Sequence, residues 1–343
     1  MQITFLKNAG QIISGTSEFD DPPHLLEMGT DTQQRMLVPK TTHHAMRLDH
    51  VLVELVPEFS RNYLQQLMES GAVCLNGKPF FKASYRVRVS DQICIELRPI
   101  PQTQAFKAEQ LALDVVYADD HLLVINKPAG LVVHPAPGHW SGTVMNALLG
   151  LDKNAFALPR AGIVHRLDKD TSGLMVVART RSVMDALVRA MAAREVKRQY
   201  VALAHGAWRG PAERVVDVAI GRDPVHRLRM AALAETHSAA KEARTDLLHL
   251  QSGEDGCLVQ CTLHTGRTHQ IRVHLASIAH PVVADTLYGG HWTAGMQRQA
   301  LHAYRLAFVH PVSQKSMVFR ADVPLDMACA IDLWRLKYNP NQI

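Results

Sequence analysis

The chain has 343 residues, of which 47% are hydrophobic and 20% are charged, ordinary values for a soluble globular protein with a sizeable core. It contains no apolar run long enough to span a bilayer and no signal-peptide pattern near Met1, so we expect a cytoplasmic protein. The five cysteines include no CxxC pair, which favours buried reduced thiols over disulfides or a zinc site.

Charge is distributed unevenly along the sequence. The net charge of +5 comes from 37 basic and 32 acidic side chains, but residues 1–40 carry a net charge of −2 and the remainder carries +7. A basic remainder of this kind favours a polyanionic partner. The N-terminal stretch has no sustained hydrophobic period and is rich in Gly, Thr, Asp and Gln, so we expect residues 1–45 to form a disordered tail.

Residues 46–98 have the pattern of a small compact unit. The positions of Leu48, Val51, Leu52 and Leu55 fit one face of a helix, and a second helix is expected from an N-cap at Ser60 to about residue 71. The following "AVCLNGKPF" has two β-prone runs around Asn-Gly, which predicts a type I′ hairpin.

The predicted order of two helices followed by a hairpin resembles the α-L RNA-binding module of a small-subunit ribosomal protein and of tyrosyl-tRNA synthetases. The residues "SRNYLQQLMESGAVCLNGK" carry most of this resemblance. The resemblance implies that basic side chains of this unit contact RNA, whereas the alternative is a surface charged only for solubility. The candidate RNA contacts are Arg47, Arg61, Lys78 and Lys82.

Residues 99–110 are expected to form a linker because they are polar, contain prolines and lack a period. Residues 111–338 are expected to form a second domain. Strands are predicted near 199–205, 258–264 and 317–321, and helices near 143–150 and 181–194. Strands and helices do not alternate strictly, so we predict an α+β fold with a mixed, mainly antiparallel central sheet flanked by helices and loops.

Common catalytic motifs are absent from the sequence. It has no G-x-S-x-G, no G-x-x-x-x-G-K-[ST] and no G-x-G-x-x-G, which argues against the usual hydrolase, NTPase and dinucleotide-binding sites. Among 19 histidines, the most suggestive set is His264, His269 and His274. Their spacing of five converges on one ion in neither a strand nor a helix, so we expect no metal site.

Three stretches place charged or aromatic groups among apolar residues. They are "AGIVHRLDKDTSGLMVVART" (161–180), "REVKRQYVALAHG" (194–206) and "TGRTHQIRVHLASIAHPVVADTLYGG" (265–290). Asp168 is expected in a turn, Tyr200 on a strand and Arg272 on another strand. A half-buried Arg272 would need a carboxylate partner, and an aspartate beside it would stay ionised. The three residues form a plausible catalytic set.

The first stretch resembles the pattern H-R-L-D-x-x-T-[ST]-G of the RluA-type pseudouridine synthases. "VINKPAGLVVHP", "KRQYVALAHG", "GRTHQIRVHLA", "HPVVADTLYGG" and "QALHAYRLAFVHP" are similar to the other stretches of that family, in the same order. The stretches around residues 132–149 and 159–178 are most similar to the ribosomal large-subunit pseudouridine synthase D group, which acts on a stem-loop of 23S ribosomal RNA. Ala284 departs from the family's usual glycine, and "KEARTDLLHL" departs from a more apolar pattern.

The resemblance implies a role for each matching residue. Asp168 matches the catalytic aspartate, Tyr200 the tyrosine that stacks on uracil, and Arg272 the arginine paired with the aspartate. Arg166 matches an arginine that fills the gap left by a flipped base, while Asp170 falls at a variable position. Further candidates for substrate binding are His165, Arg267, His269, Arg227 and Arg229, of which Arg267 is also the substitute for Arg272 in the pair.

The resemblance implies isomerisation of uridine in RNA, with 23S ribosomal RNA or a pre-ribosomal particle as the preferred partner. No redox, phosphoryl or hydrolytic step is involved, so no cofactor is expected, and we expect a monomer with no membrane partner. A transfer-RNA-directed pseudouridine synthase and a non-catalytic RNA-binding ribosome assembly factor are the alternatives. Intact Asp168, Tyr200 and Arg272 argue against the second.

Overall fold

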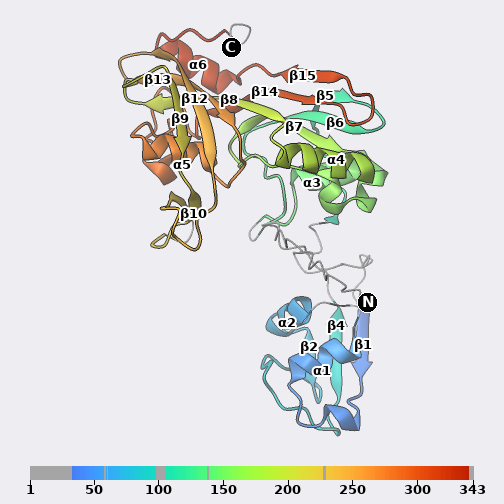
Figure 1. The fold of residues 1–343 in the computed structure, drawn as a ribbon. Helices are drawn as coiled ribbons and strands as arrows, with labels where there is room; N and C mark the ends of the chain where they lie inside the picture. Colours follow the sequence, from blue (N-terminus) through green and yellow to red (C-terminus); the bar gives the residue numbers. More distant parts are fainter. Residues whose placement is uncertain are drawn as a thin grey trace, which may run out of the picture. The chain divides into compact units, whose positions relative to one another are not determined.

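The computed structural model describes residues 33–57, 59, 61–97, 106–136, 139–226 and 229–339. The chain divides into two compact units, Met1–Thr103 and Gln104–Ile343, and Figure 1 shows the elements of each. In the described part of the chain, no helix is long and apolar enough to cross a membrane.

The first unit packs two helices on a small antiparallel sheet. Helices α1 (Leu48–Leu55) and α2 (Arg61–Glu69) precede strands β2 (Val73–Leu75), β3 (Lys78–Pro79) and β4 (Ile93–Leu97). The apolar faces predicted for the helices bury Leu48, Leu52 and Leu64 against the sheet. Asn76 and Gly77 both have positive φ, 52° and 79°, which confirms the type I′ hairpin. Ser60, the expected N-cap, lies outside the described residues.

The expectation of a disordered tail through residue 45 is wrong for its last part. Strand β1 (Gln33–Leu37) pairs antiparallel with β4, so the sheet order is β1-β4-β2-β3, and the short helix η1 (Thr41–His43) follows. Strand β1 pairs with β4 on the side that β2 leaves open, and Leu37 is buried in the core of the unit. The sequence pattern missed this strand because only alternate side chains of a short edge strand are buried. Residues 1–32 lie outside the described part of the chain.

The second unit contains a nine-stranded sheet with the order β5-β6-β7-β14-β8-β13-β12-β9, and β15 also pairs with β14. Within it, only β7 and β14 pair in parallel. The predicted mixed, mainly antiparallel sheet is therefore confirmed. The strands are β5 (Asp114–Ala118), β6 (Leu122–Lys127), β7 (Ser172–Ala178), β8 (Lys197–His205), β9 (Glu213–Asp217), β12 (Arg244–Ser252), β13 (Gly256–Leu263), β14 (Leu301–Val309) and β15 (Ser316–Arg320).

Both faces of the central strands are covered. On β7, Met175 and Val177 point into one core, whereas Leu174 and Val176 point into a second core closed by α4 (Arg181–Ala192). Because both faces are buried, the strand appears in the sequence as a continuous apolar run. Helix α3 (Val144–Leu151) covers the first core, and α6 (Leu325–Leu333) follows β15.

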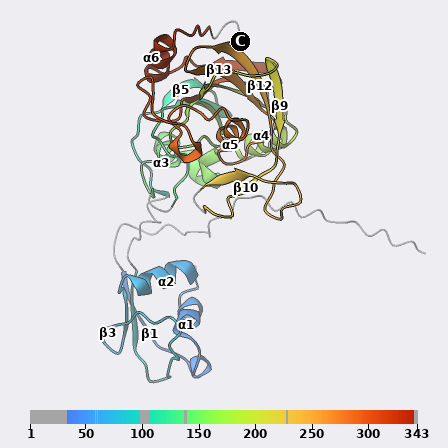
Figure 2. The same ribbon diagram turned by 90° about the vertical axis from the view of Figure 1, so that its left-hand side faces the viewer.

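Helix α5 (Gln270–Ser277) lies within the curve of β13, β12 and β9 in Figure 2, and the hairpin β10 (Ile220–Arg222) and β11 (Met230–Ala232) extends beside it. Short helices η3 (Lys153–Ala157), η4 (Pro159–Gly162) and η5 (Thr286–Tyr288) complete the unit. Residues 106–110, expected in the linker, instead pack on α3. Asn146 donates a hydrogen bond to the Lys107 carbonyl, and Phe106 contacts the core.

Candidate active site

Asp168 lies in the loop that leads into β7. Its carbonyl accepts the N–H of Thr171, which closes a tight turn, and Ile163 upstream bridges to Val177. Leu167 and Thr171 on either side are buried, while the Asp168 side chain is 16% exposed. Buried neighbours therefore hold one carboxylate at the surface of the unit, which explains why charges interrupt two apolar segments.

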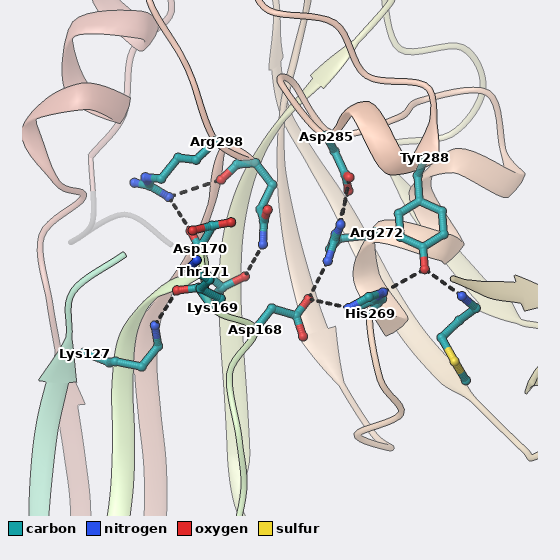
Figure 3. A network of polar contacts seen from close by, with 12 residues as sticks. Lys127, Asp168, Lys169, Asp170, Thr171, His269, Arg272, Asp285, Tyr288 and Arg298 are labelled. Carbon is teal, nitrogen blue, oxygen red and sulfur yellow. Dashed lines mark hydrogen bonds and ion pairs between the residues drawn. The ribbon is translucent and has the colours of Figure 1, made fainter. Parts of the chain in front are cut away.

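Arg272 links that carboxylate to a second one. Its Nη1 donates to Asp168 Oδ2 at 3.0 Å, and its Nε and Nη2 donate to Asp285 at 2.7 and 2.8 Å. The guanidinium is buried, and although burial lowers its pKa, the hydrogen bond to Asp285 and the charge of Asp168 raise it above the usual value. The pair expected from the sequence, Asp168 with Arg272, is present (Figure 3).

The expectation that Arg272 lies on a strand is wrong, because residues 270–277 form α5. The alternation of polar and apolar residues in "HQIRVHLA" imitates a half-buried strand. In the helix, Gln270 and His274 are four residues apart and both bond Thr245, while Arg272 faces the carboxylates. The polar side chains of α5 are thus buried and hydrogen-bonded. The spacing of polar residues in a sequence does not show whether they face solvent or buried partners.

Ala284, which precedes Asp285, has a φ of 59°. This left-handed conformation favours glycine and accounts for the glycine that the resemblance implies at this position.

Tyr200 lies on β8 with its side chain buried. Burial raises the pKa of its hydroxyl to about 12; the charge of Arg198 lowers it and the charge of Asp168 raises it. With this raised pKa the hydroxyl is neutral near pH 7, and the ring belongs to the core of the second unit.

His269 and Tyr288 lie next to the Asp168–Arg272 pair (Figure 3). His269 Nε2 is 4.0 Å from Asp168 Oδ2, and its Nδ1 is 2.8 Å from the Tyr288 hydroxyl. The Tyr288 ring covers the Arg272 guanidinium at 5.0 Å, and its hydroxyl accepts the backbone N–H of Met230. Sequence reasoning placed His269 at the site but missed Tyr288 and Asp285, although both lie in the quoted "HPVVADTLYGG".

Lys127 supports the loop that carries Asp168 through hydrogen bonds, a role that sequence reasoning missed. Its buried ammonium donates to the carbonyls of Pro128, Leu131 and Lys169. Burial lowers its pKa to about 7, against the opposing charges of Asp170 and Asp168. These bonds tie the end of β6 to the loop that carries Asp168.

Arg298 bonds the same loop from the segment just before β14 (Figure 3), and Gln299 bonds it as well. Arg298 donates to the Asp170 carbonyl at 3.0 Å, and Gln299 donates to the Thr171 hydroxyl at 3.3 Å. Asp170 thus takes part in these contacts through its backbone carbonyl. Lys127, Arg298 and Gln299 bond the loop, and Arg272 bonds the Asp168 carboxylate itself.

Some expected substrate contacts lie elsewhere. His165 is buried, and its Nε2 accepts the N–H of Val176, so we correct its assignment from substrate contact to support of the strand. Arg166 is exposed. Burial lowers the pKa of His134 and of His269, and the positive charge of Arg166 lowers both further. Arg267 donates to the Glu242 carbonyl, so it does not replace Arg272 in the pair.

In the β10–β11 segment, Arg229 pairs with Asp223, whereas Arg227 lies outside the described residues. Among the residues that the structure describes, no cluster of three His, Cys, Asp or Glu side chains could hold a metal ion.

In the first unit, Arg47 and Arg61 both pair with the buried carboxylate of Asp49. Both arginines remain substantially exposed, and Lys78 and Lys82 are exposed as well. These four side chains can therefore reach a phosphate backbone.

Comparisons with known proteins match both units. The family model for RNA pseudouridylate synthase matches residues 121–277, and that for the S4 domain matches residues 46–93. The chain is 44% identical over 302 residues to Ribosomal large subunit pseudouridine synthase D of Neisseria meningitidis serogroup B, covering 85% of this chain and 79% of that relative. It is 42% identical over 311 residues to the protein of the same name from Xanthomonas campestris pv. campestris, covering 87% and 91%.

A solved structure, Human RNA Pseudouridylate Synthase Domain Containing 4, has a similar fold. It superposes with a TM-score of 0.53 at 24% identity and covers 66% of this chain and 94% of that one.

Proposed function

The chain belongs to the RNA pseudouridylate synthase family, whose reaction converts uridine to pseudouridine, and we propose that its substrate is a uridine in large-subunit ribosomal RNA. The name and the degree of identity of the relatives support this substrate. The single structural observation that supports catalysis at this site is the contact of Asp168 with the buried Arg272, which is itself bonded to Asp285.

The reaction breaks the bond between C1′ and N1 of uridine, turns the uracil and joins C1′ to C5. We propose that Asp168 acts on the sugar, where two routes are open: the carboxylate attacks C1′, or it removes a proton from the ribose. Arg272 holds the carboxylate in position in both routes. We propose that the uracil stacks on the Tyr200 ring, which is buried and must be uncovered when RNA binds. Its hydroxyl can relay the C5 proton by taking it up while its own proton passes on to N1.

The target nucleotide must leave its stack to reach Asp168, at a cost of roughly a few kcal/mol. Arg166 is exposed two residues before Asp168 and can partly offset this cost by occupying the gap in the RNA. The S4 domain would add phosphate contacts through its exposed basic side chains, which position RNA without reading its sequence. We further propose that the protein acts as a monomer in the cytoplasm, without a cofactor.

Incubation of the purified protein with separate transcripts of 23S ribosomal RNA fragments and with a transfer-RNA pool tests the substrate. Pseudouridine can be mapped by carbodiimide modification and primer extension. We expect pseudouridine in a ribosomal stem-loop and none in transfer RNA. The reverse result would favour the transfer-RNA enzyme, and binding of ribosomal RNA with no pseudouridine in any RNA would favour the non-catalytic assembly factor.

A further inference from the structure

The hydroxyl of Tyr288 lies between the backbone N–H of Met230 and the imidazole of His269. This hydroxyl lies 2.9 Å from the Met230 N–H and 2.8 Å from His269 Nδ1. A backbone N–H can only donate, so the hydroxyl accepts from Met230 and keeps its own hydrogen for another acceptor. We infer that His269 Nδ1 accepts that hydrogen, because it lies at hydrogen-bond distance from the hydroxyl and the guanidinium under the Tyr288 ring has no acceptor.

A neutral imidazole that accepts at Nδ1 carries its hydrogen on Nε2. Burial lowers the pKa of His269, which keeps the ring neutral near pH 7. The charges that face it come from three elements: Asp168 and Asp285 raise this pKa, while Arg272 and Arg166 lower it. The Nε2–H therefore points to the side on which Asp168 lies.

The distance from Nε2 to Asp168 Oδ2, 4.0 Å, is too long for a hydrogen bond. Asp168 therefore does not bond the Nε2 donor, which lies near the carboxylate, where the sugar and base must be if Asp168 is to act on the ribose. His269 also has a φ of 57° at the start of α5, a left-handed conformation that is strained in a residue other than glycine. The bond to Tyr288, whose hydroxyl is itself bonded to the Met230 N–H, and the left-handed backbone together hold this imidazole in one orientation.

We propose that His269 donates a hydrogen bond from Nε2 to a uracil carbonyl oxygen as the base leaves C1′, and that Tyr288 is the positioning residue for this donor. The inference rests on the proposed function. Whichever route Asp168 takes, the C1′–N1 bond breaks and its electron pair passes to the uracil, whose carbonyl oxygens gain negative charge. A fixed neutral N–H stabilises that charge without transferring its proton.

The variant Tyr288→Phe isolates the hydroxyl because its ring can still cover Arg272. With enzyme in saturating excess over a ribosomal RNA transcript, we expect the single-turnover rate to fall about tenfold to a hundredfold, while the RNA Kd changes less than about twofold. Tyr304→Phe is the matched control, since it removes another buried hydroxyl, one that donates to Gln260 in the core. That variant should keep the wild-type rate.

A double-mutant cycle distinguishes positioning from general structural support. His269→Gln retains an amide donor near the position of Nε2 but has no Nδ1 for the tyrosine to bond. If the hydroxyl acts through the imidazole, Tyr288→Phe should cause no further loss of rate in the His269→Gln background. An equal fold-loss in both backgrounds, or a loss confined to Kd, would overturn the proposal.

The tautomer can be measured without RNA. In protein labelled with 15N-histidine, the ring signals of His269 are identified by their disappearance in His269→Gln. We expect the Nε2–H form in the wild type at pH 7.5, and a dominant Nδ1–H form would overturn the inference. A wild-type protein with this tautomer that modifies no RNA would instead refute the proposed function, so the two failures are distinguishable.

Discussion

Arg272 holds Asp285 through two N–H groups, at 2.7 and 2.8 Å, and presents its remaining Nη1 to Asp168 at 3.0 Å. Asp285 thus anchors the guanidinium, and the guanidinium in turn orients the carboxylate at the mouth of the site. The planar fork of arginine is suited to two carboxylates at once, which a lysine ammonium cannot reproduce.

Arg272→Lys is therefore expected to lower the single-turnover rate of pseudouridine formation at least about a hundredfold, with RNA affinity changed by less than about threefold. The rate is measured by release of tritium from C5-labelled uridine in the transcript. Arg181→Lys, which alters a surface pair with Asp185 on α4, serves as the control for the loss of a guanidinium. A fully active Arg272→Lys protein would show that the two-carboxylate geometry is dispensable.

Lys127→Met tests the support of the catalytic loop. The substitution leaves the carbonyls of Pro128, Leu131 and Lys169 without the Lys127 donor, and each carbonyl that water cannot reach costs about 1–3 kcal/mol. We expect a loss of several kcal/mol in the free energy of unfolding by urea and a lower rate in the remaining folded protein. Lys153→Met on the surface should do neither. Equal stability of the two variants would exclude the role of Lys127.

Lys127 also shows why the site could be predicted only in part. In "VINKPAG" it appears to be an ordinary charged residue at the end of a strand, because its burial depends on a carbonyl 42 positions away. Asp168 and Tyr200 were found because their motifs are local, and the antiparallel sheet because its strands have clear patterns. Arg272 was assigned correctly as a partner but wrongly to a strand. Asp285 and Tyr288 meet Arg272 only after folding, so no local period indicates them.

Stability should depend on pH through buried histidines. Burial lowers the pKa of His165 to about 3 and of His302 to about 4, below the value of about 6.5 in an unfolded chain. Below pH 6.5 these histidines are protonated in the unfolded state but stay neutral in the native state. Their contribution to the free energy of unfolding is therefore complete above this pH and decreases as pH falls toward 4.

Thermal melting between pH 8 and 4.5 measures this effect, and we expect Tm to be level above pH 7 and to fall below pH 6.5. His165→Gln keeps an acceptor for the Val176 N–H but does not titrate, so its Tm should fall less steeply. Parallel profiles for the two proteins would rule out His165 as a source of the acid sensitivity.

Phosphate contacts of the S4 domain should make RNA binding sensitive to salt. Each neutralised phosphate contributes about 0.7–0.9 to the slope of log affinity against log salt. Combined replacement of the exposed Lys78 and Lys82 by alanine should weaken binding and reduce this slope by about 1.5. Fluorescence anisotropy with a labelled transcript gives the slope. Lys153→Ala outside this domain provides the reference, and an unchanged slope in the double variant would place the RNA elsewhere.

The most direct test of the account is the variant Asp168→Asn, which keeps the size and hydrogen-bonding oxygen of the side chain but removes its charge. Pseudouridine is mapped in the ribosomal RNA transcript after overnight incubation, and RNA affinity is measured in parallel. We predict no detectable pseudouridine with near wild-type Kd. Normal pseudouridine formation by this variant would contradict the assignment of Asp168 as the catalytic carboxylate.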